Sequence, residues 1–278
     1  MPMSRTVILD FDGSVAGLDG AEMIDLRNRE EEIRFGCAEA ALRALPPFEP
    51  AGIVFMGSGD FHHVSAELIA RQRRRVQVLV LDNHPDNMRY PFGIHCGSWV
   101  AHVARLPEVS RVHVAGITSP DVESFHAFEN HLGPLRSGKV VYWCLGRSLR
   151  MLRMLGVRAS QSFEGAAEMS RALLQSLSPD PIYLSIDKDV LAPEVVQTNW
   201  DQGVMHLHEV QSLVESVKER VIGCDVVGDV SAYRYRSRLK RILSALDDQP
   251  EISGDSLELS REMHRLVNRR LVSLLGHL

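Results

Sequence analysis

The chain has 278 residues, enough for one large domain or two small ones. Hydrophobic residues make up 45% of it and charged residues 24%, as in ordinary globular proteins. The formal net charge of −5 argues against nucleic acid as a main partner, because binding phosphates requires a basic surface.

The cysteine pattern and the apolar runs indicate in which cellular compartment the protein is expected. No two cysteines form a C-x-x-C pair, which fits a reducing compartment and argues against a thiolate zinc site. No apolar run approaches the roughly 18 residues that span a bilayer. Asp10 and Asp12 interrupt the first apolar stretch, so a signal peptide is not expected. We therefore expect a cytoplasmic protein with no membrane partner. The cysteines are Cys37, Cys96, Cys144 and Cys224.

Taken in chain order, the sequence predicts strands that alternate with helices. Short apolar runs predict strands at residues 6–9, 53–56, 76–81, 111–117, 140–143, 181–186 and 221–227. Apolar residues at helical spacing predict helices at 21–45, from about 64, and at 166–177, 207–219 and 257–275. This alternation is typical of βαβ units and a mostly parallel sheet. We expect one domain over residues 1–278, since no linker or internal repeat interrupts the pattern.

Two predicted strands end in clusters of acidic residues and histidine. Asp82, His84 and Asp86 follow the strand at 76–81, and in an extended backbone alternate residues share one face. Asp187 and Asp189 follow the strand at 181–186 in the same manner. Ligands of open α/β sheets bind at the carboxyl ends of the strands. Side by side, the two strand ends would supply four carboxylates and one imidazole, enough for two divalent ions.

Several ordered motifs resemble those of the arginase/agmatinase (ureohydrolase) family between about residues 53 and 231. The family's G-G-D-H is similar to the segment 57–62, in which Phe61 is inserted. Its D-A-H-x-D matches 82–86, and its S-F-D-x-D-x-x-D-P matches 185–193. The segment 95–97 resembles a histidine-glycine loop, and 203–210 resembles the loop and helix after the third motif. Several motifs in the right order are far more specific than one D-x-D.

The resemblance implies a three-layer α/β/α sandwich with a mostly parallel sheet and two Mn²⁺ ions per chain. Asp82 and Asp187 would bridge the ions, His62 and Asp86 would complete one, and His84 and Asp189 the other. A hydroxide held between the ions would attack the carbon of a linear amidine, such as a guanidino compound, and break its C–N bond. His95 resembles the catalytic histidine that passes a proton to the leaving amine. A small-molecule substrate and a homo-oligomer are implied as well.

The sequence departs from the family pattern in the expected substrate pocket. The family usually has a glutamate just after its last strand, where this chain has Gly228, with Asp229 next to it. Asp229 would replace that glutamate in catalysis or substrate binding. Asp121 lies where the family's substrate-binding acids occur. The inserted Phe61 leaves His62 and His63 as alternative first ligands, of which His62 fits the continuation of the motif better.

Three alternatives remain open at this stage. The segment 6–14 resembles the first motif of haloacid-dehalogenase-type phosphatases, in which Asp10 would be the nucleophile. The pair His62-His63 resembles that of histone-deacetylase-like amidohydrolases, which bind one zinc ion. The missing glutamate also allows an arginase-like binding protein without catalysis.

Overall fold

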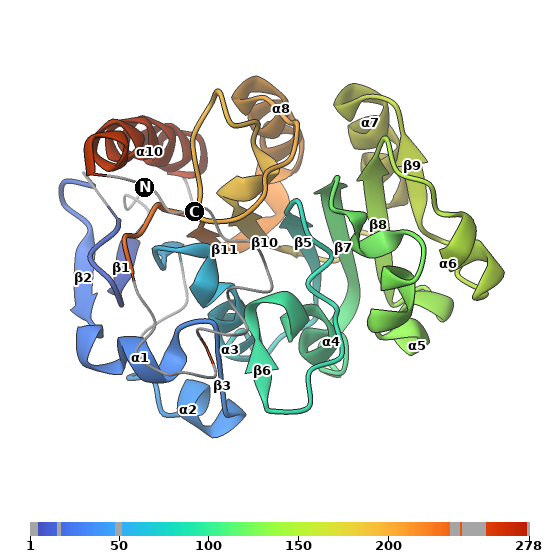
Figure 1. Ribbon diagram of the computed structural model, residues 1–278, viewed down its shortest axis with the longest axis horizontal. Coiled ribbons are helices and arrows are strands. Elements are labelled where there is room, and N and C mark those ends of the chain that lie inside the picture. The colour runs from blue at the N-terminus through green and yellow to red at the C-terminus, as the bar shows by residue number, and fades with distance from the viewer. Residues whose placement is uncertain (1–4, 16–17, 48–51, 234–239, 241–253, 277–278) are drawn as a thin grey trace.

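A computed structural model of the chain describes residues 5–15, 18–47, 52–233, 240 and 254–276. A nine-stranded sheet lies between two layers of helices (Figure 1). All of its strand pairs are parallel, so the carboxyl ends of the strands lie along one edge. The expected α/β fold with three layers is confirmed. In spatial order the strands are β2 (Glu22–Asp25), β1 (Thr6–Asp10), β4 (Ile53–Phe55), β11 (Val221–Val227), β10 (Ile182–Asp187), β5 (Val76–Leu81), β7 (Val109–Ile117), β8 (Val140–Leu145) and β9 (Gln161–Phe163).

The helices cover both faces of the sheet. On the upper face in Figure 1 lie α7 (Ala166–Ser176), α8 (Leu207–Val217) and α10 (Gly254–Leu275). On the lower face lie α1 (Glu30–Ile33), α2 (Glu39–Arg43), α3 (Ser65–Ala70), α4 (Trp99–Val103) and α5 (Leu132–Arg136), and α6 (Arg150–Met154) lies near β9. Short 3-10 helices connect these elements: η1 (Arg27–Arg29), η2 (Gly59–Val64), η3 (Cys96–Ser98), η4 (Pro120–Val122), η5 (His126–Glu129), η6 (Lys188–Val190) and η7 (Lys218–Arg220). No helix among these described residues is long and apolar enough to cross a membrane.

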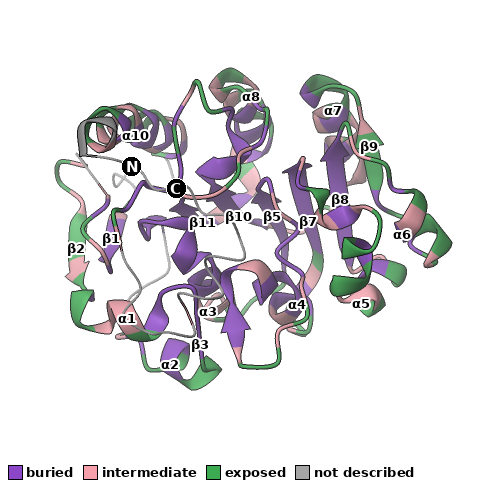
Figure 2. Cartoon of the chain, viewed as in Figure 1, coloured by how far each residue is buried: buried purple, intermediate pink, exposed green. Residues whose placement is uncertain are grey.

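The central strands are apolar throughout because both of their faces are covered. All six residues of β5 are buried, as Figure 2 shows for most of the sheet. Val78 and Val80 join the hydrophobic cluster under α2 to α5, whereas Leu79 and Leu81 join the cluster under α7, α8 and α10. Strands buried on both faces read as continuous hydrophobic runs, which is why the seven predicted strands are all present.

The prediction of one helix at 21–45 is wrong. This stretch contains β2, η1, α1, the short strand β3 (Gly36–Cys37) and α2. β2 pairs with β1 at the edge of the sheet, and Phe35 has a φ of 71°, which no helix residue adopts. The helical spacing of apolar residues was overridden by tertiary pairing.

A small antiparallel pair forms beneath the main sheet. β3 pairs with β6 (Ile94–His95), and Gly36 lies opposite His95. A Cβ at position 36 would lie 3.0 Å from the Ile94 carbonyl oxygen, so the close approach of the two strands favours glycine. This pair fixes the position of His95 and was not predicted.

Candidate metal centre

The predicted ligands come from three strand ends at one edge of the sheet. His62 lies in η2 after β4, Asp82 begins the loop after β5, and Asp187 is the last residue of β10. The two acidic loops have the same local turn. Asp82 Oδ1 accepts the His84 backbone N–H at 2.6 Å, and Asp187 Oδ1 accepts that of Asp189 at 3.0 Å. These turns explain why an Asp-x-ligand pattern recurs at both strand ends.

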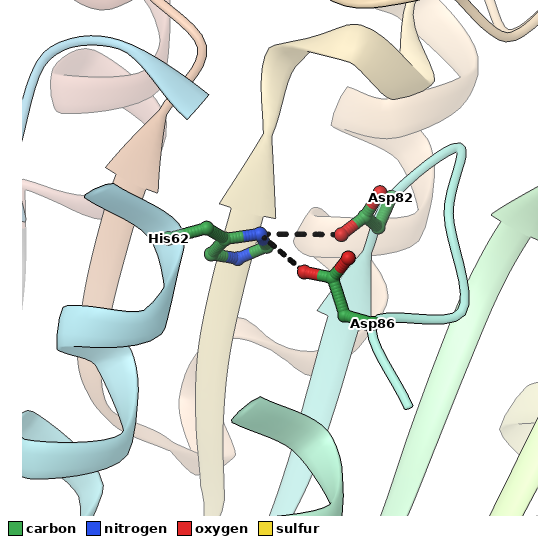
Figure 3. A group of neighbouring side chains, drawn as sticks. All are labelled: His62, Asp82 and Asp86. Carbon is green, nitrogen blue, oxygen red and sulfur yellow. Dashed lines mark ion pairs between the residues drawn. The ribbon is translucent and has the colours of Figure 1, made fainter. Parts of the chain in front are cut away.

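His62 points one ring nitrogen at three carboxylates. Its Nδ1 lies 3.2 Å from Asp82, 3.0 Å from Asp86 and 3.5 Å from Asp187 (Figure 3 shows the first two). Its Nε2 lies 2.9 Å from Ser185 Oγ, which itself donates to Asp225 at 2.6 Å. Since the Ser185 hydroxyl donates to Asp225, it accepts the Nε2–H of His62. When the ring is neutral, its Nδ1 lone pair is therefore available to a cation.

His84 occupies the second half of the cluster. Its Nδ1 lies 2.9 Å from Asp189 Oδ2 and 3.6 Å from Asp82 Oδ1. Its Nε2 lies 2.7 Å from Asp201 Oδ1. A carboxylate at the far nitrogen fixes the orientation of a metal-binding imidazole and makes it more basic. Asp201 is thus a residue of the site that the sequence motifs did not indicate.

The cluster is crowded with negative charge. Burial and the charge of Asp82 raise the pKa of Asp86 to about 7. Burial, with the charge of Asp82, also raises the pKa of Asp187 to about 6, and burial raises that of Asp189 well above its usual range. Burial lowers the pKa of His62, but its hydrogen bonds to Asp82 and Asp86 outweigh this, so the pKa is well above the ordinary value. Protons are held here because like charges are buried together.

This donor set fits divalent cations. Ligand atoms of His62, Asp82 and Asp86 lie within 4.8 Å of one another, and so do those of Asp82, His84 and Asp189. Asp82 belongs to both groups, which suits a carboxylate shared by two ions. Four buried carboxylates with two imidazoles match Mn²⁺ and other hard or borderline ions better than a thiolate-seeking metal. The bridging role of Asp187 stays a prediction.

Asp86 adopts a backbone conformation uncommon for residues other than glycine. Its φ is 46°, and its Oδ2 accepts the indole N–H of Trp99 at 2.6 Å. Aspartate tolerates this left-handed region better than most residues. The turn aims the carboxylate back at His62, which an extended D-x-H-x-D segment would not do (Figure 3).

A cavity of about 140 Å³ opens beside the cluster. It is lined by all six predicted ligands and by two further predicted site residues, His95 and Asp121. Glu129 and Trp200 also line it and were not predicted. They come from η5 and from the loop after η6, where the sequence shows no recognisable motif. The sequence therefore predicted these walls less well than the six ligands that form the acidic floor of the cavity.

His95 is held as a neutral imidazole. Burial lowers its pKa to about 4. Its Nδ1 accepts the backbone N–H of Gly97 at 3.0 Å, so the ring carries its proton on Nε2. The ring also packs edge-on against Phe35, with centroids 4.3 Å apart. The structure brings His95 to the cavity, and its catalytic role stays a prediction.

The structure does not bring Asp229 to the cavity. Its carboxylate is buried, 2.7 Å from the ammonium of Lys188, and accepts the amide of Asn268. Gly228 explains the loss of the family's glutamate: its φ is 89°, and a Cβ there would lie 2.5 Å from Asp187 Oδ1. A side chain at 228 would collide with a predicted ligand, and a one-residue shift turns Asp229 away.

The acidic residues of the Asp10 motif, at the end of β1, form ion pairs with arginines. Arg27 lies 2.7 Å from Asp10, and Arg34 lies 2.8 Å from Asp12. Arg34 is also 2.6 Å from Asp60, which belongs to the first motif but does not line the cavity. Through Arg34, Asp12 therefore connects the end of β1 to η2, which carries His62, whereas Asp10 pairs with Arg27 of η1. His63, the alternative ligand, is buried and does not line the cavity.

The sequence of the chain matches a known protein family over most of its length. The model of the arginase family matches residues 52–237. An uncharacterised protein of Thermotoga maritima is 26% identical over 179 residues, which are 64% of this chain and 58% of that protein, so the chain spans less than two thirds of its relative.

Three solved structures resemble the fold. A putative agmatinase from Clostridium difficile has a TM-score of 0.55 at 15% identity, covering 99% of this chain and 98% of its own. The agmatine ureohydrolase of Thermoplasma volcanium has a TM-score of 0.52 at 14% sequence identity, and the match covers 96% of this chain and 91% of that one. The proclavaminate amidino hydrolase from Streptomyces clavuligerus has a TM-score of 0.51 at 15% sequence identity, and the match covers 94% of this chain and 92% of that one. At these identities the similarity establishes the fold alone.

Proposed function

Since the chain belongs to the arginase family, we propose that it is a divergent manganese-dependent hydrolase of C–N bonds in linear amidines. The observation that carries the proposal is the pair of donor groups that share Asp82. One shared carboxylate between two His/Asp groups suits two ions a short distance apart. Two Mn²⁺ ions per chain are therefore proposed.

The proposed ligands are those of the two groups together with Asp187. When bound, a pair of divalent cations lowers the pKa of water and orients it for attack on a carbon at neutral pH. The chain contributes by keeping His62 and His84 in the tautomers that leave Nδ1 free, through Ser185 and Asp201. Burial of the carboxylates keeps bulk water away and strengthens their attraction for a cation.

The cavity walls suit a small cationic substrate. Asp121 and Glu129 place negative charge on the wall beyond the proposed ligands. We propose that these two carboxylates receive the positively charged part of an amidine, a role first expected of Asp121 and Asp229. His95 is proposed to relay a proton to the leaving amine. Because its ring is neutral at pH 7, it must take up a proton before it can give one.

The first experiment measures metal content per chain by plasma mass spectrometry after dialysis against Mn²⁺ without chelator. We expect about two ions in the wild type, and few in Asp82→Ala and in Asp187→Ala. Glu194→Ala is the matched control, because Glu194 is exposed and does not line the cavity. Screening guanidino and amidine compounds for released urea or ammonia then identifies the substrate. One ion or none in the wild type contradicts the binuclear proposal, and metal without turnover of any amidine favours a binding protein.

Two further properties belong to the proposal. The described cysteines are buried and form no disulfide bond, in keeping with the cytoplasm. A homo-oligomer is expected from the family resemblance, and light scattering coupled to gel filtration measures it.

A further inference from the structure

The loop that carries Asp187 and Asp189 contains a buried cation. Lys188 lies between these two predicted ligands, in η6, and its side chain is 0% exposed. Its ammonium is 2.7 Å from Asp229 Oδ2 and donates to Asn268 Oδ1 at 2.9 Å. The Asn268 amide in turn donates to Asp229 Oδ1 at 3.1 Å. Each of the three side chains thus contacts the other two.

This triad (Lys188, Asp229 and Asn268) joins three parts of the chain. Lys188 belongs to the metal loop after β10, Asp229 follows β11, and Asn268 lies in α10. The backbone N–H of Asp229 also donates to the Gly57 carbonyl at 2.9 Å, just before the helix η2 that holds His62. The triad therefore links the segments that carry the predicted ligands of β4 and β10 to the C-terminal helix.

α10 contacts the cavity wall as well. The ring of His264 lies 2.8 Å from the carbonyl oxygen of Gln197 through Nε2, and Ser260 Oγ donates to Gln197 Oε1. Gln197 belongs to the loop that carries Trp200 and Asp201, and Trp200 lines the cavity. The same face of one helix thus holds both the metal loop and a wall of the cavity.

We propose that Lys188, Asp229 and Asn268 are positioning residues that hold Asp187 and Asp189 in place and couple the packing of α10 to metal binding. This inference rests on the proposed function. An unpaired ammonium or carboxylate would not remain buried here, so the triad persists only while all three elements are packed. Lys188 does not line the cavity and acts only through its neighbours. A cation bound by Asp187 and Asp189 would favour the packed arrangement, and the packed arrangement would favour the cation.

The test compares Mn²⁺ affinity by titration calorimetry in the full chain. The variant is Lys188→Met with Asp229→Asn, because this pair removes the ion pair without leaving an unpaired buried charge. We expect its Kd for Mn²⁺ to rise by about 10–100-fold, as for other residues that orient metal ligands. The control is Leu173→Ala, which removes a buried side chain of α7, a helix of the same layer that carries no residue of the triad. It should lower thermal stability while the Kd stays within about twofold, since it leaves both acidic loops anchored.

If the double variant does not fold, Asn268→Ala and hydrogen exchange test the same coupling. Asn268→Ala leaves the Lys188–Asp229 ion pair and should raise the Kd by a smaller factor. Hydrogen exchange should slow in residues 257–272 of wild type on adding Mn²⁺, and slow less in either triad variant. Unchanged Kd in the triad variants, or an equal rise in Leu173→Ala, overturns the coupling alone. A wild type that binds no Mn²⁺ overturns the proposed function together with it.

Discussion

Replacing Gly228 by alanine tests the arrangement of the metal loop. The residue has a φ of 89°, and a Cβ would lie 2.5 Å from Asp187 Oδ1, 2.8 Å from the Lys188 nitrogen and 3.1 Å from its Cβ. Adopting the left-handed backbone costs alanine about 1–2 kcal/mol. Forcing one methyl group into a packed site costs about 1–3 kcal/mol more. Gly228→Ala should therefore lower the free energy of unfolding by about 2–5 kcal/mol, a large part of a typical domain's stability.

The same methyl group displaces a predicted ligand, which gives a second measurable effect. We expect urea unfolding of the metal-free protein to show the loss of stability, and calorimetry to show Mn²⁺ affinity reduced at least about tenfold. Gly133→Ala is the control, because a Cβ in that helix meets no atom within 4 Å and should add about 0.5–1 kcal/mol. A Gly228→Ala protein within about 0.5 kcal/mol of wild type, with unchanged affinity, would refute the reasoning.

Three further predictions concern single carboxylates. The pKa of Asp86 rises from 3.8 to about 7, so metal-free wild type should lose stability relative to Asp86→Asn as pH increases between these values, on the order of 4 kcal/mol by urea unfolding. A difference that does not change with pH contradicts the burial of charge. Asp201→Asn should weaken Mn²⁺ binding about tenfold, because it loses the carboxylate that orients His84. Equal affinity of variant and wild type by calorimetry would show that the His84 ring does not depend on this carboxylate. Asp10→Asn should leave hydrolysis of guanidino compounds unchanged, because Asp10 pairs with Arg27 outside the cavity, whereas loss of a phosphatase activity would revive that alternative.

The central sheet and the acidic floor were predictable because each has a strong local signal. Strands buried on both faces are continuous apolar runs, and β5 and β10 show this plainly. The acidic turns follow those strands directly, so sequence spacing alone brings Asp82 and Asp187 to one edge. The tautomers of His62 and His84 were not predictable, since they depend on Ser185 and Asp201 across the site.

The edges of the sheet and the cavity walls were predicted poorly for a different reason. β2 lies at the edge of the sheet beside β1, and three of its four residues are exposed, so it carries no buried apolar run. The stretch 21–45 has apolar residues at helical spacing because its short elements pack one side against the core, which spacing cannot distinguish from a single helix. The direction of Asp229 depended on the conformation of Gly228, and a φ of 89° has no signature beyond the glycine itself.

The predicted metal ligands and the cavity walls belong to different kinds of structure. Most of the donors lie within a few residues of a strand end, on a sheet that cannot shift without disturbing two cores. Glu129 and Trp200 lie on connections that pair with no strand of that sheet. Such connections tolerate insertion and exchange far better than the strands they join. A lineage could thus acquire new substrates by changing these walls while the same cluster of His and Asp side chains is inherited unchanged.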